Sequence, residues 1–211
     1  MELPRPPIPD ERLDGWAETE ATVEEAFSTP VVTVHTHTVV YEETEEREAI
    51  QQKTGIDLPW RFFFSSRIRL EPQRSPSKLL TSLIRRKAVE GFTNRLADRG
   101  FEQLSERTRE EAAIGDADGL RVAHRGVLRH DIAERTERDA TDMLTLPVAA
   151  MLAVWAADGD YHVAGGGYPA DRPDSGPGDC VDTVAEIIDP RTAQSTLRSL
   201  IDSCGPTGSR D

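Results

Sequence analysis

The sequence predicts an α+β protein built from a single antiparallel β-sheet of about six to seven strands packed against helices. Several segments are dense in β-branched residues or alternate apolar and polar positions, which is typical of strands. Most of them are separated only by short turns, and strands joined by hairpins pair antiparallel. The other periodic segments carry an apolar stripe at helical spacing, and such stripes are buried against a sheet.

The chain opens with a predicted hairpin and a short helix. Residues 16–27 place several apolar side chains on one parity, and residues 31–41 are rich in Val and Thr, so both segments favour strands. Residues 43–54 form a charged segment that predicts a helix. Gly55 follows directly, and glycine suits the left-handed residue at which many helices end.

A third strand and the longest helix come next. Residues 61–70 alternate along their length and predict a strand. Ser77 can cap the following helix, which ends at Gly100. The apolar stripe of this helix consists of Leu80, Leu83, Ile84, Ala88, Phe92 and Leu96.

The second half of the chain begins with more strands. Residues 101–114 and 120–128 predict a hairpin whose turn lies at residues 116–119. Residues 144–157 are apolar on both faces, which indicates a central strand. A further turn leads into a strand over residues 161–168.

Two helices are expected at the end of the chain. They cover residues 180–188 and 190–204, and Pro190 suits the first turn of the second helix because its nitrogen needs no hydrogen-bond partner there. The apolar stripes of both helices would cover the sheet.

The length of 211 residues favours one domain, which we place at residues 13–204. Residues 1–12 are rich in proline and predict an extended arm. Residues 130–142 are polar and predict an exposed insertion, and residues 205–211 predict a disordered tail.

The net charge is −13, and only three of the 25 basic residues are lysines. Abundant Asp and Glu with scarce Lys is similar to the composition of halophilic proteins, since a large net charge resists association and salt screens the self-repulsion. The charge is uneven: residues 1–60 carry −10, residues 61–129 carry +6, and residues 130–211 carry −9. The basic centre either neutralises the acidic ends or forms an anion site. General affinity for DNA is disfavoured, because phosphate contacts need a basic face.

Nothing in the sequence resembles a secretory leader, and no apolar run approaches the roughly 20 residues of a membrane-spanning helix. Cys180 and Cys204 do not match a zinc-site spacing. They either form one bridge between the last two helices or stay reduced, as in a cytosol. We therefore expect a cytoplasmic protein with no membrane span and no cofactor.

His35 and His37 are candidate metal ligands. Residues two apart on a strand project to the same face, so both imidazoles could bind one transition metal. A third ligand would have to come from another histidine or a carboxylate on a neighbouring strand. The alternative is that Val32–Val40 alternation buries one face and leaves both histidines on the other.

Two further groups are candidate ligand-binding residues. Gly165, Gly166 and Gly167 lack the spacing of a dinucleotide or phosphate loop, but they allow a bulge or a close backbone approach that a ligand could use. Arg67 and Arg69 could extend a basic patch formed by the helix residues Arg85, Arg86 and Lys87. An aromatic cluster is expected in the core, and one face of the strand that carries it could line a pocket or a partner interface. The cluster consists of Trp60, Phe62, Phe63 and Phe64.

Residues 153–169 (AVWAADGDYHVAGGGYP), 60–64 (WRFFF) and 96–101 (LADRGF) resemble a haloarchaeal family of proteins of unknown function. The resemblance covers about residues 16–204 and implies no activity and no site residues. The order of helices and hairpins is also similar to the PsbP-like fold, an antiparallel sheet packed between helices. That topological resemblance implies a binding or accessory role rather than catalysis, although a fold does not determine a function.

The sequence thus favours a non-catalytic binding or accessory module with an unidentified small ligand or protein partner. Two alternatives stay open. One is a small metal-dependent protein or enzyme that uses His35 and His37. The other is an anion- or nucleic-acid-binding module that uses the basic segment over residues 61–129.

Overall fold

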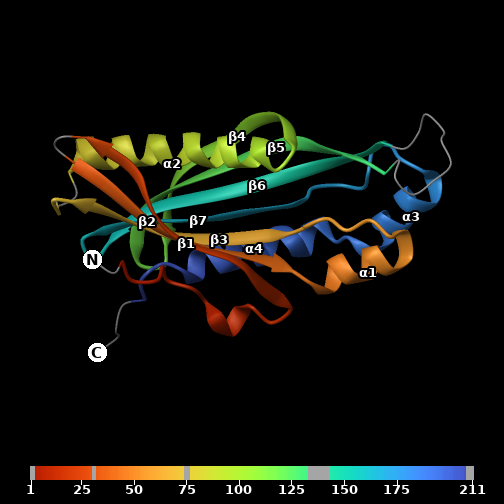
Figure 1. Ribbon diagram of the computed structural model, residues 1–211, viewed down its shortest axis with the longest axis horizontal. Coiled ribbons are helices and arrows are strands. Elements are labelled where there is room, and N and C mark those ends of the chain that lie inside the picture. The colour runs from red at the N-terminus through yellow and green to blue at the C-terminus, as the bar shows by residue number, and fades with distance from the viewer. Residues whose placement is uncertain (1–2, 30–31, 74–76, 133–142, 208–211) are drawn as a thin grey trace.

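Seven strands form one antiparallel sheet in the order β1-β2-β3-β7-β6-β5-β4 (Figure 1). The structure is a computed structural model that describes residues 3–29, 32–73, 77–132 and 143–207. The chain builds β1 to β3 in succession, crosses to the far edge, and returns through β4 to β7 so that β7 pairs with β3. The strands are β1 (Trp16–Thr29), β2 (Val32–Glu43), β3 (Phe62–Glu71), β4 (Phe101–Ile114), β5 (Ala117–Asp131), β6 (Met143–Ala157) and β7 (Asp160–Pro169).

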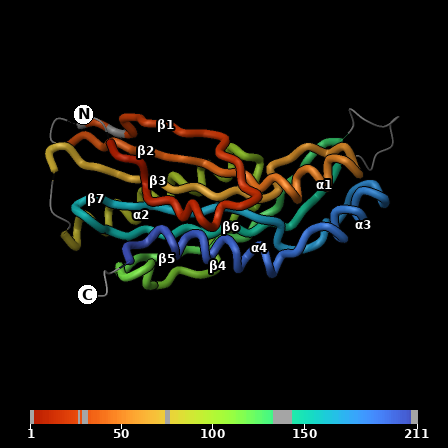
Figure 2. Tube along the Cα trace, turned by 90° about the horizontal axis from the view of Figure 1, so that it is seen from below, coloured from red at the N-terminus to blue at the C-terminus, as the bar shows by residue number. Residues whose placement is uncertain are grey.

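Four α-helices accompany the sheet within the described residues: α1 (Glu45–Thr54), α2 (Lys78–Asp98), α3 (Gly178–Ile187) and α4 (Pro190–Ser203). Helix α2 covers one face, and α4 covers the other together with the segment that precedes β1 (Figures 1 and 2). Helices α1 and α3 lie side by side at one end of the sheet. A single 3₁₀ turn, Asp10–Arg12, interrupts the N-terminal segment and was not expected from the sequence.

The two faces of the sheet carry separate apolar cores because successive side chains of a strand point to opposite sides. Phe62 and Phe64 face α2, whereas Phe63, between them, faces α4. Strand β6 contributes to both cores, as its continuous apolar sequence predicted, and it lies between β7 and β5. A third cluster joins α1 and α3 to the end of the sheet: Ile50, Ile56, Trp60, Ile132, Leu144, Leu146, Val148, Val184 and Ile188.

The predicted fold class, an antiparallel sheet with helices packed on it, is confirmed, and so are the predicted signals at the starts and ends of helices. Ser77 Oγ accepts a hydrogen bond from the Leu80 N–H at 3.3 Å and caps α2. Gly55 has a φ angle of +71° and directly follows α1, and Gly100 has a φ angle of +84° and lies just beyond the end of α2. Pro190 is the first residue of α4.

The turn between β4 and β5 lies two residues earlier than predicted. The chain reverses at Gly115 and Asp116, and residues 117–119 already pair in the ladder. Gly115 has a φ of +57°, and an added Cβ would lie 2.5 Å from the Pro206 oxygen. Glycine is needed here because the end of the chain packs on the turn, where the Asp116 N–H donates to the Pro206 carbonyl at 2.8 Å.

The predicted arm, insertion and tail fall partly outside the described residues. Residues 3–9 have no regular secondary structure, and Leu3 is buried against the α4 side of the sheet. Residues 130 and 131 belong to β5, while residues 133–142 are not described. Gly205 is buried against the β4–β5 turn, and residues 208–211 are not described. Cys180 and Cys204 are free thiols.

Candidate functional site

The two candidate metal ligands on β2 have different partners, a backbone carbonyl of the N-terminal segment for His37 and a carboxylate of β3 for His35. His37 Nδ1 lies 3.0 Å from the Leu3 carbonyl oxygen, so this nitrogen donates its proton there. His35 Nε2 lies 3.2 Å from a carboxylate oxygen of Glu71. No group of three or more His, Cys, Asp and Glu residues suited to a metal occurs in the parts of the chain that the structure describes. The metal site stays a prediction that gains no third ligand from these residues.

Arg67 and Arg69 bind a buried carboxylate instead of facing an open surface. The Asp160 side chain is 1 % exposed and accepts hydrogen bonds from Arg69 at 2.7 and 2.9 Å and from Arg67 at 3.2 Å. Burial raises the pKa of Asp160, but the hydrogen bonds and charges of Arg69 and Arg67 outweigh it and hold the pKa below its usual value. Arg67 also separates His37 from His162 across three paired strands.

The expected extension of a basic patch from Arg67 and Arg69 to the α2 arginines is wrong. Side chains of β3 alternate between faces, and both arginines share the face of Phe63, which α4 covers. Helix α2 packs on the opposite face, against Phe62 and Phe64. The sheet therefore separates the two basic groups.

The close approach expected at residues 165–167 is made by backbone carbonyl groups and side chains of the protein itself. A Cβ at Gly166 would overlap the Phe62 carbonyl oxygen and lie 2.8 Å from Leu197 Cδ1. At Gly165 it would lie 2.9 Å from a ring carbon of Phe64, and at Gly167 it would lie 2.6 Å from one of Phe62. All three glycines are buried, so a ligand at this place would have to displace these residues.

Two of the cavities lined by described residues open on the α2 side of the sheet. The smaller one has a volume of about 260 Å³, with Phe62, Phe64 and Phe92 on its floor, as expected for one face of the aromatic cluster. Its rim arginines are already paired: Arg95 lies 3.4 Å from Glu24, and Arg99 lies 3.6 Å from Glu42. The two arginines of this cleft are therefore already engaged by carboxylates.

The larger cavity is a cationic groove with a volume of about 700 Å³ between the first half of α2 and strands β4 and β5. Four of its lining side chains are cationic and one is acidic, whereas the whole chain carries a net charge of −13. The groove thus gathers positive charge in an otherwise acidic protein. Its lining residues are Ser77, Lys78, Thr81, Ser82, Arg85, Arg86, Arg109, Glu111 and Leu120.

The four cations of the groove differ in how they are held. Arg109 donates two hydrogen bonds to Glu106 at 2.7 and 2.9 Å. Arg85 Nη1 donates to Glu111 at 2.7 Å, and its Nε is buried without a partner. Lys78 and Arg86 form no hydrogen bond or ion pair with other described residues. Two cations are therefore fixed in place and two are available to an anion.

The start of α2 adds to the positive potential of the groove. Unpaired N–H groups give a helix N-terminus a partial positive charge, and acidic side chains usually compensate it. The first turn of α2 contains no acidic residue and begins with Lys78. Ser77, Thr81 and Ser82 supply hydroxyl donors beside it. This arrangement can hold a negatively charged group by charge and hydrogen bonding together.

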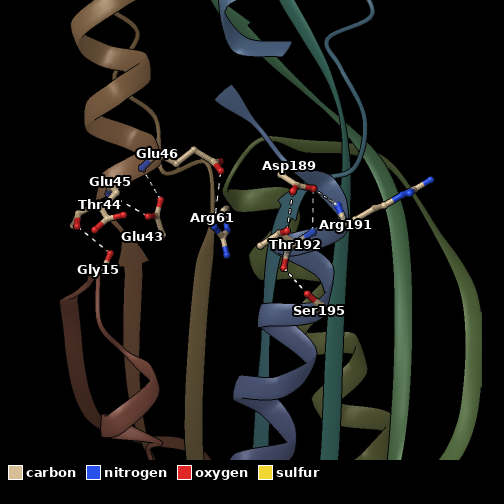
Figure 3. Close-up of polar contacts among 10 residues, drawn as sticks. All are labelled: Gly15, Glu43, Thr44, Glu45, Glu46, Arg61, Asp189, Arg191, Thr192 and Ser195. Atoms are coloured by element: carbon tan, nitrogen blue, oxygen red, sulfur yellow. Dashed lines mark hydrogen bonds and ion pairs between the residues drawn. The ribbon is translucent and has the colours of Figure 1, made fainter. Parts of the chain in front are cut away.

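A buried carboxyl group lies at the other end of the molecule, in the first turn of α1 (Figure 3). The Glu46 side chain is 10 % exposed, its Oε1 has no partner, and its Oε2 lies 3.8 Å from Arg61 Nη1. Glu43 caps the same helix by accepting the N–H groups of Glu45 and Glu46. Burial, and then the charges of Glu43 and Asp189, raise the pKa of Glu46 to about 7 despite the opposing charge of Arg61.

We expect Glu46→Gln to stabilise the protein at pH 8 by about 2 kcal/mol. The folded state holds the Glu46 proton more tightly than the unfolded chain, so wild-type stability falls as the pH rises from about 4.5 to about 7 and then levels off. Glutamine carries no charge and removes this loss. Urea denaturation of both proteins between pH 4.5 and pH 8 measures it.

The matched control is Glu48→Gln, which removes an exposed carboxylate from the same helix turn. This variant should follow the wild-type pH dependence. A Glu46→Gln protein that loses stability over the same pH interval as the wild type would show that Glu46 titrates normally.

The sequence model of one protein family, a domain of unknown function (DUF6517), matches residues 5–205. The chain belongs to this family. The match includes every helix and strand described above and all residues of the cationic groove. No curated protein and no solved structure matches the chain. None of the described helices of this DUF6517 protein is long and apolar enough to cross a membrane.

Sequence reasoning found only part of the groove of this DUF6517 protein. It singled out Arg85 and Arg86, but grouped them with Lys87, which lies on the outer side of α2 and does not line the groove. It missed Lys78 and Arg109. The position of Arg109 could not be read from strand parity, because the β4–β5 register shifts between Glu106 and Thr108 and again nearer the start of β4.

Proposed function

We propose that this protein is a non-catalytic binding module whose cationic groove holds an anionic ligand of the phosphate class. The observation that carries the proposal is the convergence of Lys78, Arg85, Arg86 and Arg109 on one concave site in a chain of net charge −13. Guanidinium groups bind phosphate oxygens in a bidentate manner, and lysine adds a mobile point charge. The basic segment over residues 61–129 supplies all four of these cations.

The geometry supports binding rather than catalysis. The groove presents donors that neutralise and orient an anion: guanidinium, ammonium and hydroxyl groups. The two carboxylates next to it are each engaged by an arginine, Glu111 by Arg85 and Glu106 by Arg109. Hydrogen bonding to Arg109 holds the pKa of Glu106 below its usual value, so this group stays ionised and is a poor proton acceptor.

Isothermal titration calorimetry with pyrophosphate tests the proposal. We expect the wild type to bind, and the variants Lys78→Gln and Arg86→Gln to bind about tenfold more weakly each, since a hydrogen bond to a charged group contributes roughly 1.5–3 kcal/mol. Both side chains are exposed, and neither forms a hydrogen bond or ion pair with another described residue, so their loss should leave folding intact.

Lys87→Gln is the control for that titration. Lys87 adjoins Arg86 in the same helix but lies outside the groove, and its substitution by glutamine removes the same charge. If Lys87→Gln weakened binding as much as Arg86→Gln, the attraction would be general electrostatics and the proposed site would be wrong. Binding that persists in molar KCl, where the Debye length is about 3 Å, would support a specific site.

The cellular setting belongs to the same proposal. The acidic, lysine-poor composition supports a halophilic protein of the cytoplasm, and the resemblance to a haloarchaeal family supports such an origin. The similarity of the element order to the PsbP-like fold supports an accessory role in which the protein binds rather than transforms its ligand.

A further inference from the structure

Two leucines stand exposed on the outer side of α2, beside the groove but not in it. Leu79 is 84 % exposed and Leu83 is 42 % exposed. Residues four apart in a helix lie on the same face one turn from each other, so the two side chains form one apolar spot. The other large apolar residues exposed in the described chain, Val23 on β1 and Met143 at the start of β6, stand singly on strands.

Cations surround this leucine pair. Lys78, Arg86 and Lys87 are exposed on the same part of α2, and the helix contains no acidic residue before Glu90. Glu90 itself pairs with Lys87 at 2.9 Å. A helix face with an apolar centre and a cationic border matches the pattern of segments that lie in the interface of an anionic lipid membrane.

The position of α2 in the fold presents this face to an extended surface. The helix lies on the outside of the sheet on its side (Figure 1), and Leu79 and Leu83 are exposed on it. A protein partner that binds a helix by its apolar face needs a hydrophobic groove of its own, whereas a membrane is met by a protruding convex face. The leucines would enter the interface while the cations approach the lipid phosphates.

We propose that the first half of α2 docks this protein on the surface of an anionic lipid membrane, with Leu79 and Leu83 inserted and Lys78, Arg86 and Lys87 against the lipid phosphates. The net charge of −13 does not prevent this approach. In the vesicle experiment below, at about 0.15 M salt, charges farther away than about 8 Å are largely screened, so the local charge of α2 decides the contact. The docking does not depend on an occupied groove.

Co-sedimentation with lipid vesicles tests the proposal. We expect the wild type to bind vesicles of equal parts phosphatidylcholine and phosphatidylglycerol about tenfold more strongly than vesicles of phosphatidylcholine alone. The double variant Leu79→Ser/Leu83→Ser should bind the mixed vesicles about tenfold more weakly than the wild type, because its apolar contact is lost. Val23→Ser removes an exposed apolar residue from β1 and should bind like the wild type.

Two further variants separate this surface from the groove. Lys87→Gln should weaken vesicle binding while leaving pyrophosphate binding unchanged, and the double leucine variant should do the same. Fluorescence of Leu79→Trp should be quenched by brominated lipid, whereas that of Val23→Trp should change no more than the wild-type signal does. The proposal would be overturned if the wild type did not bind the mixed vesicles, or if the double leucine variant bound them as strongly as the wild type. The leucine pair would then be a contact site for a protein partner.

Discussion

Replacing Asp160 by asparagine is expected to lower the free energy of unfolding by about 3 kcal/mol at neutral pH, the lower end of the range for breaking a buried ion pair. Asp160 is the shared acceptor of Arg67 and Arg69 and is itself 1 % exposed. Asparagine keeps the shape but removes the charge, and its amide donors then face guanidinium donors. The two arginines are partly exposed and can regain some hydration, which moderates the loss. Urea denaturation of wild type and variant measures it.

The pH dependence gives the same prediction a second readout. The arginines hold the pKa of Asp160 in the folded protein below its value in the unfolded chain. The ionised carboxylate therefore contributes fully to the free energy of unfolding when the pH is above the unfolded pKa, and this contribution is lost as the pH falls through the folded pKa. The Asp160→Asn protein lacks this part of its acid sensitivity. Asp158→Asn is the control, since residue 158 has a φ of +54°, which asparagine adopts readily. An Asp160→Asn protein as stable as Asp158→Asn would contradict the assigned role of the buried carboxylate.

Gly166→Ala is expected to destabilise the protein by about 3 kcal/mol, the upper part of the range for overpacking a core. The new methyl group would overlap the Phe62 carbonyl oxygen on the paired strand and press on Leu197 of α4 from 2.8 Å. Strand β3 cannot retreat without breaking its pairing with β7, and α4 cannot retreat without opening the core on that face. The melting temperature and the urea midpoint should both fall.

Gly91→Ala is the matched control for this substitution. Residue 91 lies in the middle of α2, and a Cβ there would meet nothing within 4 Å. Alanine favours the helix over glycine by roughly 1 kcal/mol, so this variant should be slightly more stable than the wild type. The packing explanation fails if Gly166→Ala unfolds at the same urea concentration as Gly91→Ala.

The elements of this protein could be predicted because their signals are local. The alternation in residues 61–70, the Ser77 cap and Pro190 each act within a few residues of the chain. The central place of β6 followed from its two apolar faces, since only a strand covered on both sides needs them. Such patterns predict which face of a helix or strand a residue lies on and where that element begins or ends.

The candidate sites were harder to predict because they join residues from different elements. The sequence indicated that Arg67 and Arg69 share a face. It could not show that Asp160 would meet them, because three strands, β4 to β6, lie between β3 and β7 in the chain although β3 and β7 pair in the sheet. Glu46 looked like any charged residue of a helix start until the packing around α1 buried it.

The sequence by itself determined the order and type of the elements, the caps and turns that bound most of them, and an acidic chain with a basic centre. The tertiary structure alone decided that Lys78 and Arg86 of α2 meet Arg109 of β4 around one groove, and that Leu79 and Leu83 are left on the outside. The reason is physical: periodicity and backbone preference act between near neighbours, whereas strand pairing, register shifts and the seating of a helix on a sheet depend on contacts between distant residues.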